Sequence, residues 1–282
     1  MALKRYRHYN RKRAIVLACF GSVIEQQKYL DLKELIEEKF PDCTVFISFS
    51  SRMVIRMLKK QKKEVYKNLQ QTLADVDMEG YKHVVVSSIN IYPTDEHEFL
   101  KKIVDGFQHF SLANLACTNA ILTKTKETTD YLKDLNQRVT KEDTANLYVI
   151  HGTPKLNTIG IDSISYTKEF LELIDDNNFV CSLEGALPYN QISEVLKAKM
   201  QKKGIKKVQV IPLLLVSGNH YIKDMFEIKD DLSDMFESSI VESLSQSESF
   251  NLIELEKTQT IIIKEIEESF KLLGVRHKQI TY

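Results

Sequence analysis

Three polar residues stand at or just beyond the ends of apolar runs in the second half of this 282-residue chain: His151, Glu184 and His220. Two imidazoles and one carboxylate suit a borderline divalent ion such as Co²⁺, Ni²⁺, Fe²⁺ or Zn²⁺. Three protein ligands also leave positions open for water or a substrate. The same side chains can act as general bases. From spacing alone, the alternative that either histidine is only structural stays open.

The apolar runs alternate with segments of helical spacing, which predicts parallel sheets flanked by helices. Strands are expected over 14–20, 44–49, 83–91, 112–122, 146–151, 179–184 and 208–216. Helices are expected over 22–40, 53–60, 65–77, 93–107, 127–139, 163–174, 189–203 and 252–273, with a polar stretch over 223–248. Ligands of open α/β sheets bind beyond the carboxyl ends of the strands, where the three residues fall.

An internal repeat divides the chain. Residues 80–96 align without a gap with 204–220, and 18–22 align with 149–153. The repeat predicts two similar α/β lobes, over 13–140 and 141–282, behind a basic arm at 1–12. We expect a cleft between the lobes, where the strand ends meet. In this alignment Glu96 is the counterpart of His220, so the metal-competent residues lie in the C-terminal lobe.

Composition excludes several classes of protein. Lys+Arg and Asp+Glu both number 39, which argues against a nucleic-acid partner. The apolar run behind the basic N-terminus covers only 14–20, too short for a secretory signal, and no run approaches the ~18 residues of a membrane helix. The four cysteines form no C-x-x-C pair, so we expect reduced thiols and no structural zinc. A cytoplasmic protein without a membrane partner is the simplest interpretation.

Six segments occur in an order that resembles a known family. They are 19–22 (CFGS), 49–56 (FSSRMVIR), 88–98 (SINIYPTDEHE), 150–152 (IHG), 183–184 (LE) and 211–225 (IPLLLVSGNHYIKDM). Together they are similar to the anaerobic sirohydrochlorin cobaltochelatases of cobalamin biosynthesis, which are class II chelatases and lyases with a two-lobed fold. The resemblance covers about residues 13–225. It implies insertion of a divalent metal, with cobalt favoured, into a tetrapyrrole without ATP, and the chain has no G-x-x-x-x-G-K-[ST] loop for a nucleotide.

The resemblance also implies roles for individual residues. His151, Glu184 and His220 match metal-binding positions, and Glu96 matches an acidic residue that faces the macrocycle. His151 or His220 is the expected base for the pyrrole protons, with Glu96 assisting. Glu96 has the alternative of complementing a helix dipole.

Sirohydrochlorin carries many carboxylates, so a site for it needs basic or amide donors. Arg52 and Arg56 are the best-placed cations, with an exposed helix face as their alternative. Ser22 and Thr153, at the repeat-related exit turns, are expected to donate hydrogen bonds from helix N-termini. His97 and Glu98 are expected on the solvated face of a helix, with an accessory metal role for one of them as the alternative.

Two positions depart from the family pattern, and two other functions stay open. Family members often have histidine at the position of Asn90, so any accessory metal or proton role of that histidine is lost here, and many have glycine at the position of Ile150. An iron or nickel chelatase for a related tetrapyrrole is the nearest alternative, because ligand type does not separate these metals. A non-catalytic carrier of tetrapyrrole or metal is another. The final helix is expected to pack in the core, with a homo-oligomer interface as its alternative.

Overall fold

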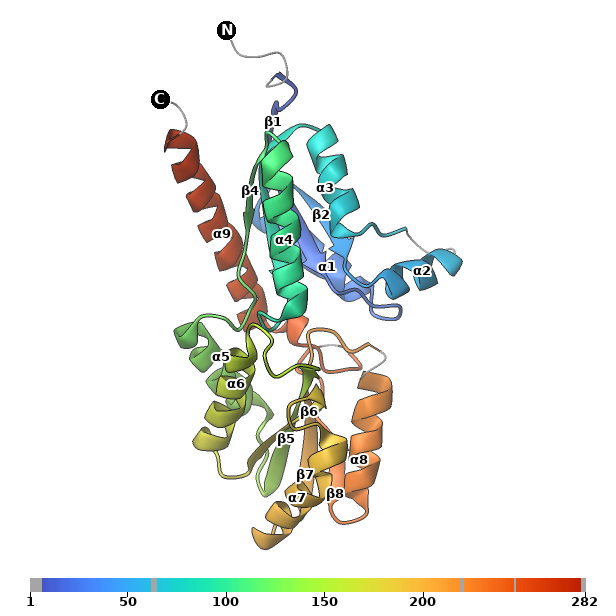
Figure 1. Cartoon of the computed structure of the whole chain (residues 1–282). Coiled ribbons are helices and arrows are strands. Elements are labelled where there is room, and N and C mark those ends of the chain that lie inside the picture. Colours follow the sequence, from blue (N-terminus) through green and yellow to red (C-terminus); the bar gives the residue numbers. More distant parts are fainter. Residues whose placement is uncertain (1–6, 62–64, 219–220, 246, 280–282) are drawn as a thin grey trace. The chain divides into compact units, whose positions relative to one another are not determined.

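The chain folds into two compact units, each built around one parallel sheet (Figure 1). The computed structural model describes residues 7–61, 65–218, 221–245 and 247–279. The first unit comprises 1–121 and 258–282, and the second comprises 122–257. The strand orders are β2-β1-β3-β4 and β6-β5-β7-β8, with every pairing parallel. The matching orders agree with the internal repeat and confirm the α/β class, and the expected cleft stays a prediction.

The first unit holds four strands and five longer helices among its described residues. They are β1 (Arg11–Cys19), α1 (Gln27–Lys39), β2 (Cys43–Phe49), α2 (Arg52–Lys60), α3 (Leu69–Met78), β3 (Tyr81–Ile89), α4 (Asp95–Phe110), β4 (Asn114–Cys117) and α9 (Glu256–Gln279). Ala14 to Cys19 are all buried, as expected of a central parallel strand covered on both faces. Ala14, Val16 and Ala18 belong to a core cluster with residues of α3 and α4.

The basic arm is shorter than the sequence indicates. β1 already begins at Arg11, and the residues before it are attached to the end of α3. Tyr9 donates a hydrogen bond of 2.8 Å to the Asp77 carboxylate, and Arg11 pairs with Glu79 at 2.9 Å. Residues 1–6 lie outside the described residues.

The final helix belongs to the first unit, whereas the repeat places it in the C-terminal lobe. Phe270 contacts Phe40 just after α1, with ring centroids 6.3 Å apart, and Arg13 of β1 lies over the same ring. Glu265 is buried and accepts hydrogen bonds from the backbone and side-chain amides of Asn119. An amphipathic helix does not identify its partner in its own sequence, and α9 covers a sheet formed much earlier in the chain. Its residues Ile261, Ile262 and Ile266 are buried, as expected of core packing.

The second unit repeats the strand order of the first. Its elements are α5 (Thr125–Val139), β5 (Thr144–Thr153), α6 (Ile161–Ile174), β6 (Asn178–Gly185), α7 (Tyr189–Lys202), β7 (Lys207–Leu213), a π-helix (Tyr221–Met225), α8 (Phe226–Ser233), β8 (Glu237–Ile240) and a 3₁₀ turn (Leu252–Glu254). One core cluster joins buried residues of β5, β6 and β7 to α7 and α8. α5 lies in this unit and contacts α6 through Thr129 and Tyr166, so it is not part of an N-terminal lobe as expected.

The polar stretch over 223–248 contains α8 and β8, which the sequence analysis missed. β8 pairs with β7, from Lys207 opposite Glu237 to Val210 opposite Ile240. Its four residues, Glu-Ser-Ser-Ile, contain no apolar run and none of them is fully buried, as expected of an edge strand. No helix in the described ranges is long and apolar enough to cross a membrane.

The attachment of α9 can be tested at Glu265. Replacing it with alanine removes the carboxylate that accepts two hydrogen bonds from Asn119, and a hydrogen bond to a charged group contributes more than a neutral one, so we expect Glu265→Ala to lower the free energy of unfolding by about 1–3 kcal/mol. Urea unfolding followed by circular dichroism measures the loss. Glu267→Ala, on the exposed face of the same helix, is the matched control. Equal stability of the two variants would contradict the assignment.

Candidate active site

His151 and Glu184 lie together at the carboxyl ends of two neighbouring strands. β5 and β6 run parallel with Gly152 opposite Glu184, so His151 is the residue just before the strand partner of Glu184. The His151 Nδ1 and Glu184 Oε1 atoms are 3.5 Å apart, and both side chains are about half exposed (46% and 49%). Two donor atoms bound about 2.1 Å from one tetrahedral metal are roughly 3.4 Å apart. The pair therefore has the spacing of two ligands of one ion.

Two glycines allow the backbones of β5 and β6 to approach closely at their carboxyl ends. Gly152 and Gly185 have φ angles of +83° and +78°, which L side chains rarely adopt. A Cβ atom on Gly152 would lie 2.0 Å from the Glu184 carbonyl oxygen, and one on Gly185 would lie 1.6 Å from that of Thr153. The backbones approach so closely that only glycine fits at either position.

His220 lies outside the described residues, as does Asn219. The chain before them is anchored at Ser217, which is buried and hydrogen-bonded through its backbone N–H to Asn251 Oδ1 at 2.6 Å and through its hydroxyl to Phe250 O. Within the described ranges there is no cluster of three His, Cys, Asp or Glu side chains that could hold a metal ion. His220 stays the predicted third ligand beside His151 and Glu184.

A groove of about 540 Å³ adjoins the His151–Glu184 pair and carries further carboxylates, from Asp224, Glu227 and Asp231. Asp231 accepts hydrogen bonds from Tyr189 at 2.6 Å and from the buried Lys197 at 2.8 Å. Partial burial opposes ionisation of Asp231, but these two donors outweigh it and hold the pKa of the carboxyl below its ordinary value. The Asp231 carboxylate is thus already hydrogen-bonded to Tyr189 and Lys197.

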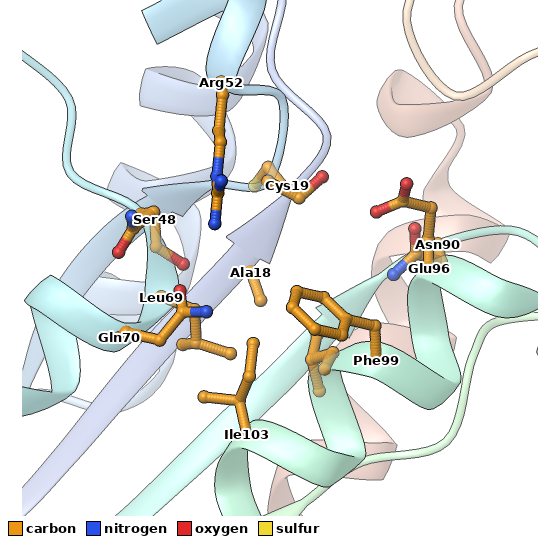
Figure 2. A pocket seen from close by; sticks show the side chains of 13 residues that line it. Ala18, Cys19, Ser48, Arg52, Leu69, Gln70, Asn90, Glu96, Phe99 and Ile103 are labelled. Atoms are coloured by element: carbon orange, nitrogen blue, oxygen red, sulfur yellow. The ribbon is translucent and has the colours of Figure 1, made fainter.

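A second, smaller pocket of about 40 Å³ lies at the carboxyl ends of β1, β2 and β3 in the first unit. Figure 2 shows Arg52, Asn90 and Glu96 among the side chains that line it. Arg52 is the first residue of α2 and follows the N-cap residue Ser51, whose side chain accepts a hydrogen bond from Val54 N–H. Two of the residues predicted from the sequence, Arg52 and Glu96, therefore share this pocket. Arg56 is exposed on α2 and does not line it.

Ser22 and Thr153 are buried, and both hydroxyls take part in local hydrogen bonds. Ser22 Oγ accepts from the backbone N–H groups of Ile24 and Glu25, and Thr153 Oγ1 pairs with Thr158 Oγ1 at 3.1 Å. Neither residue lines the two pockets described above. Their predicted contact with a substrate gains no support, and both hydroxyls stabilise the turns that follow β1 and β5.

His97 is buried (3% exposed), so its expected place on a solvated helix face is wrong. Its Nδ1 lies 2.8 Å from the buried Ser88 hydroxyl. Burial lowers the pKa of His97, Lys101 lowers it further, and Glu98 partly offsets these effects. His97 has helical spacing with Leu100 and Val104, which are also buried, so the sequence did contain a signal for its burial.

A family model described as cobalt chelatase (CbiK) matches residues 13–271. A sirohydrochlorin cobaltochelatase, CbiKC, of Nitratidesulfovibrio vulgaris strain Hildenborough is 26% identical over 220 residues, which cover 76% of this chain and 75% of the relative. A sirohydrochlorin cobaltochelatase of Salmonella typhimurium strain LT2 is 21% identical over 221 residues, with 76% and 80% covered.

Solved structures of low identity share the fold. SirB from Bacillus subtilis with Fe³⁺ has a TM-score of 0.64 at 14% identity, covering 92% of this chain and 95% of that one. The sirohydrochlorin chelatase SirB from Bacillus subtilis subspecies spizizenii, in complex with cobalt, has a TM-score of 0.63 at 13% identity, covering 92% and 96%.

The glycine at the strand ends gives a test of the metal pair. In Gly152→Ala the new Cβ meets the Glu184 carbonyl, so the strands must part and the His151–Glu184 spacing must change. We expect the affinity for Co²⁺ to fall about 10- to 100-fold, measured by optical titration. Gly106→Ala, where nothing lies within 4 Å of the added Cβ, is the control. Unchanged affinity in Gly152→Ala would show that the strand ends do not set the site.

Burial of His97 predicts a pH dependence of stability. Because its folded-state pKa is below the ordinary value of about 6.5, the unfolded chain binds more protons in acid. The stabilisation is complete above about pH 6.5 and is lost as the pH falls through the folded-state pKa. The free energy of unfolding should therefore fall more steeply between pH 7 and pH 5 in the wild type than in His97→Asn. Parallel curves from urea unfolding would contradict this.

Proposed function

This chain belongs to the cobalt chelatase (CbiK) family and is a metal chelatase, and from that premise we propose that it inserts Co²⁺ into sirohydrochlorin. The two curated relatives bear the name of that reaction. The reaction uses no nucleotide and belongs to the anaerobic route of cobalamin biosynthesis. The metal is a substrate, because it leaves in the product.

The His151–Glu184 pair is the observation that carries the proposal. One imidazole and one carboxylate, with donor atoms 3.5 Å apart and about half exposed, bind a divalent ion while leaving positions to incoming nitrogens. His220 is the proposed third ligand. A site with few protein ligands and low net charge releases its metal to the four nitrogens of the macrocycle more readily than a closed structural site does.

The imidazoles are also candidates to accept the protons that the macrocycle releases. Two pyrrole N–H protons leave the ring for each divalent ion that enters. An imidazole nitrogen that coordinates the metal has its lone pair engaged, and the lone pair becomes available when the metal moves to the ring. His151 and His220 are therefore proposed to hold the metal first and to accept protons afterwards. Glu96 is proposed to assist as a carboxylate at the first turn of α4.

The polyanionic ring is proposed to bind Arg52 and Arg56. Arg52 lines the pocket that also holds Glu96, and Arg56 lies one turn further along α2. A guanidinium binds a carboxylate through two parallel hydrogen bonds, which suits the acidic side chains of sirohydrochlorin. Ser22 and Thr153 are left out of this contact because their hydroxyls are buried.

The proposed compartment is the cytoplasm. All four cysteines are free, and burial raises the pKa of each thiol. Unpaired thiols with raised pKa values stay protonated and suit a reducing environment.

Anaerobic insertion assays with Co²⁺, Fe²⁺ and Ni²⁺, on sirohydrochlorin and on a protoporphyrin, test the function and its alternatives. We expect a metal-dependent change in the absorption spectrum of sirohydrochlorin, fastest with Co²⁺, and none with the protoporphyrin. Faster insertion of Fe²⁺ or Ni²⁺ would favour the other chelatase. Tight binding without turnover would favour a carrier.

Alanine variants in the same assay test the residues. His151→Ala and His220→Ala should each reduce the insertion rate at least about 100-fold, because each removes a metal ligand. His109→Ala is the matched control, since His109 is exposed in the last turn of α4. Near-normal insertion by both His151→Ala and His220→Ala would exclude the proposed site.

A further inference from the structure

A buried hydrogen-bond chain runs from the pocket of the first unit to the start of α4. Asn90 Nδ2 donates to Ser88 Oγ at 3.0 Å, and Ser88 Oγ is 2.8 Å from His97 Nδ1. Ser88 and His97 are 2% and 3% exposed. Asn90 is the member of the chain that lines the pocket.

The chemistry of the three side chains indicates which atom donates in each of these hydrogen bonds. The amide nitrogen of Asn90 can only donate, so it occupies a lone pair of Ser88 Oγ and leaves the hydroxyl hydrogen for another acceptor. Burial lowers the pKa of His97, which favours the neutral imidazole, and we assign the tautomer with the proton on Nε2, in which Nδ1 accepts that hydrogen. With Nδ2 held by Ser88, the Asn90 amide cannot rotate without breaking this bond, and Oδ1 remains as its acceptor.

The chain also fixes the first turn of α4. The N-cap residue Thr94 makes no side-chain capping bond, so the helix start lacks the usual local restraint. The His97–Ser88 bond ties that turn to the end of β3 instead. Ser88 is itself held through its backbone N–H to Thr118 Oγ1 at 2.9 Å, and Asn90 O accepts from Ile121 N–H at 2.9 Å. The anchor therefore extends from β3 to the segment after β4.

Glu96 stands next to His97 in this turn, and Glu96 and Asn90 both line the pocket (Figure 2). We infer that His97 is a positioning residue: through Ser88 it sets the Asn90 amide and the first turn of α4, so that Asn90 Oδ1 and the Glu96 carboxylate form a pair of acceptors for the pyrrole N–H groups of the substrate. The inference rests on the proposed function. It adds Asn90 and His97 to the residues on which proton removal depends.

The test separates the positioning role from a merely structural one. His97→Phe keeps the ring volume but leaves the buried Ser88 hydroxyl without its acceptor, so both the melting temperature and the insertion kcat should fall. Ser88→Ala/His97→Phe removes both partners, so most of the stability should return. Asn90 has still lost its anchor in the double variant, and kcat should stay about tenfold or more below the wild type. Co²⁺ affinity should not change, because His151 and Glu184 belong to the second unit.

His97→Asn provides the rescue. Its Oδ1 can accept from Ser88 in place of Nδ1, so this variant should recover most of the insertion kcat that His97→Phe loses. A stable Ser88→Ala/His97→Phe variant with the wild-type kcat would overturn the inference while the proposed function stands. So would a folded His97→Asn variant as slow as His97→Phe. A wild-type protein that inserts no metal into sirohydrochlorin would overturn both.

Discussion

The close approach of β5 and β6 at Gly152 and Gly185 is the constraint on which the proposed metal chemistry depends. Parallel strands in register bring the ends of both strands to one edge, but at Gly152 and Gly185 the positive φ would point a Cβ atom at the carbonyl of the neighbouring strand. Two glycines with positive φ remove that obstacle, and His151 and Glu184 then face a common point from adjacent strands. The spacing of His151 and Glu184 thus depends on the backbone at the two glycines, although both side chains are about half exposed.

The two units use one topology for different chemistry. In the second unit, the strand ends present an imidazole and a carboxylate beside a groove rich in further carboxylates. In the first unit, the corresponding edge presents Arg52, Asn90 and Glu96, which suit a polyanionic ring with N–H donors. The repeat pairs Phe20 with His151 and Glu96 with His220, so the two sheets carry different residues at corresponding strand ends.

The sequence predicts the parts of the fold that depend on local patterns. The central strands are buried on both faces and read as apolar runs, so the ends that carry His151 and Glu184 could be located. β8 could not be located from the sequence, because this short edge strand pairs, among the described strands, only with β7 and has no apolar run of its own. The place of α9 depends on contacts of Phe270 and Glu265 with residues far away in the chain. The burial of His97 was predictable from its spacing with Leu100 and Val104, but its bond to Ser88 required the structure.

The central claim is that His151, Glu184 and His220 hold the metal before it enters the ring. Cobalt K-edge X-ray absorption of the Co²⁺-loaded protein, without tetrapyrrole, tests this directly. The account predicts scattering from two imidazoles at about 2.1 Å, by analogy with Zn–N distances, together with oxygen ligands. One imidazole should disappear in His151→Ala. A spectrum without imidazole scattering, or one that His151→Ala leaves unchanged, would contradict the account.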